Sequence, residues 1–174
     1  MRAVVTSPTL PAAELRFVYR GPSAEAAPLA SGELRRQIGL KLRAQDGCNV
    51  VYVMWRIEPQ SGLVVSMKQN PGKSRHAECG DRGYRNVKPE RSARLPEIRA
   101  GEPHVLRAAM HADRVEVRAD GEVVWAGSLG GGALEFDGPV GVRTDNGEFE
   151  LSLSAAPSAT GPTVECTAAR AAGD

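Results

Sequence analysis

The chain has 174 residues, of which 41% are hydrophobic and 25% are charged, and its formal net charge is +1. This length and composition are typical of one globular domain with a sizeable core. No apolar run approaches the roughly 18–20 residues of a membrane-spanning helix, so we expect no membrane association. The apolar piece after Met1 is too short for a secretory signal, and we expect a cytoplasmic protein unless a leader has been removed.

Hydrophobic residues alternate with a period of two along most of the chain, which indicates β-strands. The first four predicted strands are residues 15–19, 34–44, 49–57 and 63–68. The segments 1–12 and 155–174 are rich in alanine and proline and bury too little apolar area to offset the entropy of ordering. We therefore predict flexible tails on both sides of a single domain that spans residues 13–154.

The predicted strand 49–57 is apolar on both faces, as expected of a central strand that is covered on both sides. We assign one face to the core between two sheets: Val51, Val53, Trp55 and Ile57. The other face carries Tyr52, Met54 and Arg56. This face either lines a concave surface, where an aromatic ring and a guanidinium can contact a ligand, or forms a second small core under the loop that follows.

Residues 69–103 lack clear strand patterning and are predicted to form a long basic loop. Segment 68–99 holds nine Lys and Arg against four Asp and Glu, a local charge of +5 in a nearly neutral chain. Such a segment attracts anionic groups, and arginine suits carboxylate or phosphate oxygens. Turns in this loop can present four side chains together: Arg82, Tyr84, Arg85 and Lys88. Alternatively, its arginines pair with Glu78, Asp81 and Glu90 on a solvated loop.

The C-terminal third predicts five more strands, at residues 105–110, 114–119, 122–126, 138–144 and 148–154. Asp120-Gly121 favours a type I′ turn and closes the first of two predicted hairpins. The tripeptide 145–147 closes the second, and Trp125 is assigned to the core. So many short strands, with proline or glycine at nearly every break, predict an all-β antiparallel sandwich or jelly roll.

The strings HVLRAAMHADRVEVRADGEVVWAG and FDGPVGVRTDNGEFELSLS, within residues 104–154, resemble the C-terminal half of concanavalin A-like lectin and glucanase domains. Similar strings occur in laminin-G-like and 3-keto-disaccharide-hydrolase-like branches. The resemblance implies two curved sheets, often with a carbohydrate or polyanion on the concave face or rim loops. It does not imply catalysis, because the Glu-x-Asp-x-Glu strand of the glucanases is incomplete at 135–137 and 148–150.

Cysteine and histidine residues indicate no reactive or metal site. Three cysteines make no disulfide framework; Cys48 and Cys79 either form one bridge or remain thiols, and Cys166 lies in the predicted C-terminal tail. Their spacing matches no zinc pattern, and we expect no metal and no cofactor. His76 and Cys79 would point to opposite sides of an extended segment, which weakens a catalytic dyad.

We therefore predict a non-catalytic module that binds a glycan or another anionic ligand, with no catalytic residues assigned. The predicted contacts are Tyr52, Arg56, Arg82, Tyr84, Arg85 and Lys88. The alternatives are an enzyme acting on glycosides, with carboxylates among Glu58, Glu78 and Asp81, and a structural or protein-interaction domain. Nucleic acid is disfavoured as a ligand because the basic residues are confined to one loop with a single interleaved tyrosine. The oligomeric state is left open.

Overall fold

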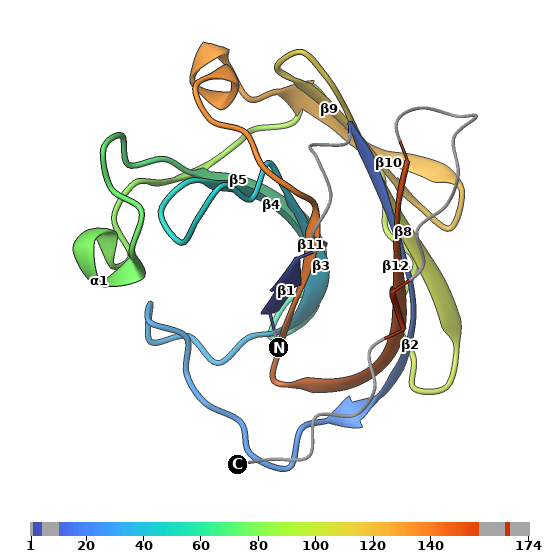
Figure 1. The fold of residues 1–174 in the computed structure, drawn as a ribbon. Coiled ribbons are helices and arrows are strands. Elements are labelled where there is room, and N and C mark those ends of the chain that lie inside the picture. Colours follow the sequence, from blue (N-terminus) through green and yellow to red (C-terminus); the bar gives the residue numbers. More distant parts are fainter. Residues whose placement is uncertain (1, 5–10, 157–165, 168–174) are drawn as a thin grey trace.

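The chain forms two antiparallel β-sheets that lie face to face, which confirms the predicted β-sandwich (Figure 1). The computed structural model describes residues 2–4, 11–156 and 166–167. Every strand predicted from the alternation is present, with ends that shift by a few residues.

The first sheet, here called sheet A, has six strands in the order β1-β11-β3-β4-β5-β6. Its strands are β1 (Arg2–Val4), β3 (Arg36–Leu42), β4 (Val50–Glu58), β5 (Gly62–Lys68), β6 (Tyr84–Asn86) and β11 (Gly141–Asp145). Strands β4 and β5 pair directly across the turn that contains Pro59.

The second sheet, sheet B, has seven strands in the order β13-β12-β2-β8-β9-β10-β7. Its strands are β2 (Ala12–Pro22), β7 (Arg91–Ser92), β8 (Pro103–His111), β9 (Arg114–Ala119), β10 (Glu122–Ser128), β12 (Gly147–Ala156) and β13 (Cys166–Thr167). Asp120 and Gly121 join β9 to β10 with φ values of 50° and 90°. Two positive φ values are what a type I′ turn requires, so the first predicted hairpin is confirmed.

The main core lies between the two sheets. Val51, Val53 and Trp55 are fully buried there, and Ile57 packs against them, as predicted from the alternation along β4. The Trp55 ring meets Phe17 of β2 edge to face, with centroids 5.8 Å apart. Trp125 is 2% exposed and also belongs to this core, as predicted.

The segment around Asn146 corrects the second predicted hairpin. Strand β11 pairs with β3 in sheet A, whereas β12 pairs with β2 in sheet B, so residues 145–147 carry the chain from one sheet to the other. Asn146 has a φ of 55°, and its side-chain amide donates to the carbonyls of Ala27 and Arg35. The sequence prediction failed because a turn signal reports a local reversal of direction and not the sheet that the next strand joins.

Residues 69–103 contain more regular structure than the sequence predicts. They hold the short helix α1 (His76–Cys79), β6 at one edge of sheet A and β7 at one edge of sheet B. Strands of two or three residues are too short to show alternation, which is why the pattern missed them. A second short helix, η1 (Gly131–Leu134), precedes β11. The described part of the chain has no helix long and apolar enough to cross a membrane.

Both chain ends are described only in part. Residues 2–4, which were expected to be flexible, pair with β11, and β2 already begins at Ala12. At the other end, β12 continues to Ala156 and pairs with β13. The rest of the two predicted tails, residues 1, 5–10, 157–165 and 168–174, lies outside the described residues.

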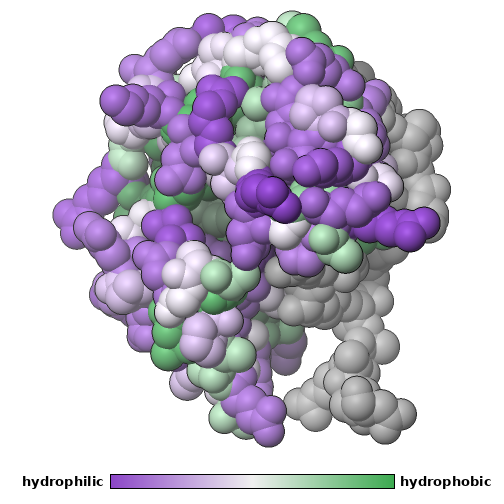
Figure 2. Space-filling view, turned by 90° about the vertical axis from the view of Figure 1, so that its left-hand side faces the viewer, coloured by the Kyte–Doolittle hydropathy of each residue, from purple (hydrophilic) through white to green (hydrophobic). Residues whose placement is uncertain are grey.

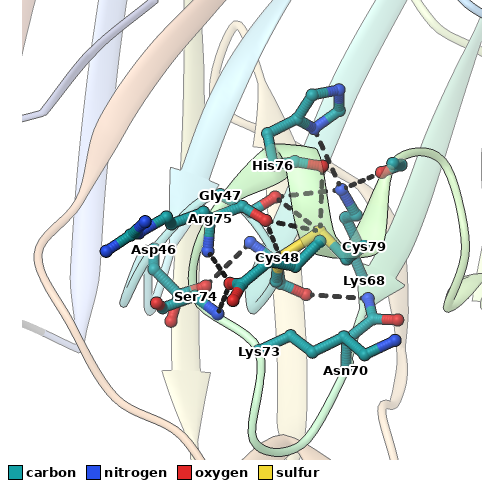
Figure 3. Close-up of a disulfide and its surroundings, with 12 residues drawn as sticks. Asp46, Gly47, Cys48, Lys68, Asn70, Lys73, Ser74, Arg75, His76 and Cys79 are labelled. Carbon is teal, nitrogen blue, oxygen red and sulfur yellow. Dashed lines mark hydrogen bonds between the residues drawn. A yellow bond between two sulfur atoms is a disulfide. The ribbon is translucent and has the colours of Figure 1, made fainter.

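A disulfide between Cys48 and Cys79 resolves the alternative that the sequence left open (Figure 3). It joins the turn before β4 to the last residue of α1. Glu78 holds the start of the same helix, because its carboxylate accepts hydrogen bonds from the backbone N–H groups of Ser74 and Arg75. The disulfide therefore ties the segment between β5 and β6 to the turn before β4, and Glu78 orders the segment internally.

We expect that replacing both bridged cysteines, Cys48→Ser with Cys79→Ser, lowers the free energy of unfolding by about 3–4 kcal/mol. That is the chain-entropy value for a loop with a sequence separation of 31 residues. Denaturant unfolding under non-reducing conditions measures the difference. The control is the unaltered protein after reduction, which should unfold as the double variant does; equal stability of the double variant and the unreduced protein would contradict the bridge.

Gly39, in the middle of β3, lies where strands β3 and β4 leave no room for a side chain. A Cβ atom at this position would lie 2.1 Å from the carbonyl oxygen of Val53 and 2.8 Å from Sδ of Met54. The first contact is with backbone, which cannot move away cheaply. We expect Gly39→Ala to cost roughly 1–3 kcal/mol of stability, as overpacked sites do.

Gly62, at the start of β5, is the control, because a Cβ there meets nothing within 4 Å. Gly62→Ala should be neutral or slightly stabilising. Thermal or denaturant unfolding of the two variants separates the cases. Equal effects of the two substitutions would show that β3 and β4 do not approach as described.

Candidate functional site

A groove of about 740 Å³ lies on the face of sheet A that points away from sheet B. In Figure 1, α1 and the segment between β2 and β3 stand on opposite sides of this open face. Figure 2 looks toward it and shows hydrophilic residues around a hollow with hydrophobic residues at its bottom. The floor includes Val50, Met54 and Val64. The sequence expectation that the Tyr52 face of β4 lines a concave surface therefore agrees with the structure.

Strand alternation and register bring the groove side chains together. Lys41 of β3, Tyr52 of β4, Ser66 of β5 and Asn86 of β6 are direct neighbours across the sheet. Because residues that are two apart in a strand share a face, the next positions along these strands also face the groove. The polar and charged residues added in this way are Gln37, Arg56 and Lys68. Arg35, directly before β3, and Arg143 of the neighbouring strand β11 also line the groove.

Two stacked tyrosines form the aromatic part of the groove. The rings of Tyr52 and Tyr84 lie 6.0 Å apart with an interplanar angle of 26°. The Arg143 guanidinium lies 5.2 Å from the centre of the Tyr52 ring, and the Lys68 ammonium lies 5.2 Å from that of Tyr84. Tyr52 is 6% exposed and Tyr84 is 43% exposed, so Tyr84 offers its ring to solvent while Tyr52 supports it.

Partial burial, together with the neighbouring Tyr52, raises the pKa of Tyr84 to about 12. Its phenol therefore stays protonated and uncharged throughout the physiological range. A neutral phenol can donate a hydrogen bond to a ligand and can also accept one.

Lys68 stiffens the wall of the groove beside α1. Its side chain is buried, and its ammonium donates to the carbonyl oxygens of Gly47 at 2.9 Å and Gly80 at 2.5 Å. Nδ1 of His76 lies 3.4 Å from the same ammonium. Gly47 precedes Cys48 and Gly80 follows Cys79, so the ammonium and the disulfide join the same two segments of the chain (Figure 3). Because Cys79 is bridged, the His76–Cys79 pair contains no free thiol.

Three arginines gather at the other end of the groove. Arg143 donates to Asp145 at 2.9 Å, and Gln37 donates to the same carboxylate at 2.7 Å. Burial alone would lower the pKa of Arg143, but the Asp145 charge and hydrogen bond outweigh it and leave that pKa raised. Burial lowers the pKa of Arg56, and burial with the charges of Arg56 and Arg143 lowers that of Arg35.

The structure brings three of the six predicted ligand contacts into the groove: Tyr52, Arg56 and Tyr84. The other three do not line it. Arg85 pairs with the core residue Met67, lies on the opposite face of sheet A, and donates to the carbonyl of Leu129. Arg82 and Lys88 are exposed in the turns on either side of β6. The basic loop therefore does not present its charges together on one surface.

Sequence reasoning missed several groove residues that are far apart along the chain: Arg35, Gln37, Lys41, Lys68 and Arg143. The alternation along β3 and β5 could have identified Lys41 and Lys68. Their neighbours in sequence point into the core, so these two side chains point to the other face of the sheet. Arg143 could not be placed, because the predicted hairpin paired its strand with residues 148–154, whereas the strand pairs with β3.

Of the three carboxylates considered for catalysis, two have other roles and one lines the groove. Glu58 forms an ion pair with Arg36. Hydrogen bonds from the backbone N–H groups of Arg75 and Ser74 lower the pKa of Glu78, which keeps this carboxyl ionised. Asp81 lines the groove beside α1, together with Asp46.

Asp46 organises the turn before β4, since its carboxylate accepts hydrogen bonds from the backbone N–H groups of Cys48 and Asn49. Within the described ranges, no three His, Cys, Asp or Glu side chains come close enough to hold a metal ion.

No protein-family model and no curated protein sequence matches the chain. Among solved structures, the carbohydrate binding module CBM66 from Bacillus subtilis superposes with a TM-score of 0.56 at 11% identity, over 86% of this chain and 76% of that one. CG-16, a homodimeric agglutinin from chicken liver, gives a TM-score of 0.49 at 12% identity, over 88% and 100% of the two chains.

The catalytic domain of an endo-1,3-beta-glucanase from Thermotoga petrophila gives a TM-score of 0.42 at 15% identity, over 83% of this chain and 57% of that one. At such low identity, the match to the Bacillus subtilis module speaks to the fold and not to the ligand. The chain has the concanavalin A-like β-sandwich fold, in agreement with the resemblance found in its sequence.

Proposed function

We propose that the protein is a carbohydrate-binding module that holds its ligand in the groove on the open face of sheet A. The observation that carries this proposal is the Tyr84 ring, exposed at the groove and supported by Tyr52 among amide, hydroxyl and guanidinium groups. A sugar ring has apolar C–H faces and a rim of hydroxyl groups. An aromatic ring beside fixed polar groups complements both parts of such a ligand.

The polar groups that would meet sugar hydroxyls come from three different strands. Gln37, Ser66 and Asn86 all line the groove, and the first two are buried. Amide and hydroxyl groups can both donate and accept, which matches a hydroxyl partner. The Bacillus subtilis module with the same fold is itself described as carbohydrate-binding, which is consistent with this proposal.

The state of the carboxylates favours binding over hydrolysis. A glycosidase needs a pair of carboxyl groups, one of them an acid with a raised pKa. Glu78 has a lowered pKa and supports α1, and Glu58 pairs with Arg36. The acidic residues at the groove are Asp46, which accepts backbone hydrogen bonds, and Asp81. Hydrolysis by this pair is the alternative that an activity assay should address.

The disulfide also supports a proposal about the cellular compartment in which the protein works. Disulfides persist in oxidising surroundings and are rare in the cytosol of most organisms. The Cys48–Cys79 bridge fixes the wall of the groove, so the binding surface depends on its being oxidised. We propose that the protein works in an oxidising compartment, in place of the cytoplasmic location expected from its N-terminus.

A glycan array, followed by calorimetry on the glycans that bind, tests the proposed function. We expect Tyr84→Ala to weaken binding at least about tenfold, or ~1.4 kcal/mol, because it removes the exposed ring. Leu134→Ala is the control, since Leu134 is 52% exposed and does not line the groove. It should bind as the unaltered protein does.

Three results would contradict the proposal. Failure to bind any neutral or charged glycan would rule out the module. Release of reducing sugar that is lost in Asp81→Asn would instead establish the hydrolytic alternative. Equal binding by the Tyr84→Ala and Leu134→Ala proteins would show that the ligand binds outside the groove.

A further inference from the structure

We infer that the arginine end of the groove, formed by Arg35, Arg56 and Arg143, binds a negatively charged group on the saccharide. That group is a carboxylate or a sulfate ester, so the ligand is an acidic glycan. The inference rests on the proposed function and adds the chemical class of the ligand. It starts from an imbalance of charge in this part of the groove.

The arginine end is held together by the register of sheet A. Arg56 of β4 lies opposite Gln37 of β3, and Gln37 lies opposite Asp145 of β11. Arg143 is two residues before Asp145 and so faces the same side. Arg35 directly precedes β3. These side chains converge from three adjacent strands, of which β11 is far from the other two in sequence.

The three guanidinium groups outweigh the carboxylates available to them. Asp145 is bonded to Arg143 and Gln37, and Glu33 pairs with Arg35 at the surface. Among the described residues, Arg56 forms no ion pair, and its Nε atom is buried without a hydrogen-bond partner. Arg56 and Arg143 both contribute as like charges to the lowered pKa of Arg35, which is consistent with their common place in the groove lining.

A partly buried guanidinium without a counter-charge is unfavourable, because burial removes water and nothing replaces it. A bound anion would supply the missing charge and would accept hydrogen bonds from terminal N–H groups of these arginines. Guanidinium groups are planar and donate two parallel hydrogen bonds, which fits the oxygens of a carboxylate or of a sulfate.

The other end of the groove differs in kind. There Lys68 donates to backbone carbonyls, and the acidic residues Asp46 and Asp81 lie nearby. Tyr52 lies between the two ends, in contact with Tyr84 on one hand and Arg143 on the other. A saccharide can therefore place an uncharged ring over Tyr84 and its anionic substituent at the arginines.

Calorimetry on the full chain with two pairs of matched ligands tests the inference. One pair is a galacturonate oligosaccharide and its methyl ester; the other is a sulfated oligosaccharide and its desulfated form. We expect the charged member of at least one pair to bind at least about tenfold more tightly than its neutral partner. This preference should shrink as salt concentration rises. The pair that responds identifies the anion.

Arg56→Gln should abolish the preference for the charged ligand. The control is Arg107→Gln, on β8 of sheet B, which should retain it. Because Arg56 forms no ion pair in the protein, Arg56→Gln should fold with an unchanged or raised Tm. A marked fall in Tm would assign Arg56 to holding the sheet together and would overturn the inference.

The inference and the proposed function fail in different ways. Equal affinity for the charged and neutral members of both pairs would overturn the anion site and leave the carbohydrate-binding module intact. A preference that survives Arg56→Gln would also overturn the site. Lack of binding to every saccharide would overturn the proposed function, and the inference with it.

Discussion

Burial of strand β4 on both faces is the constraint on which the rest of the structure depends. Val51, Val53 and Trp55 fill the core between the sheets, while Tyr52, Met54 and Arg56 face the groove. Core packing and the lining of the groove cannot be changed independently, because a shift of register by one residue would exchange the two faces of β4. The packing that fixes Trp55 in the core therefore also fixes the positions of Tyr52 and Arg56.

Local patterns in the sequence were sufficient to predict the fold. Of the six ligand contacts predicted from them, three line the groove. Alternation and the Asp-Gly turn identified the strands and one hairpin, since both depend on neighbours in sequence. Arg143 escaped because the choice of sheet by β11 is a long-range property, decided by its pairing with β3. Arg85 was misplaced because β6 is too short to show which of its residues faces the core.

The clustering of basic residues along the sequence did not predict where cations line the groove. The sequence concentrates basic residues in segment 68–99, yet only Lys68 of those lysines and arginines lines the groove. Most of the cations at the groove come from isolated positions on β3, β4 and β11 or beside them. A local count of charge cannot find such a cluster, because the sheet brings Arg143 beside residues of β3 and β4 that are distant from it in sequence.

The restraint on Arg143 has a consequence for how tightly a ligand can be held. An arginine on a free surface loses much of its rotamer freedom when it closes on an anion, and that loss subtracts from affinity. Arg143 is already fixed by Asp145 and by the Tyr52 ring. Its conformational entropy is lost during folding, before any ligand arrives. The groove is thus preorganised, and more of each new contact remains as binding free energy.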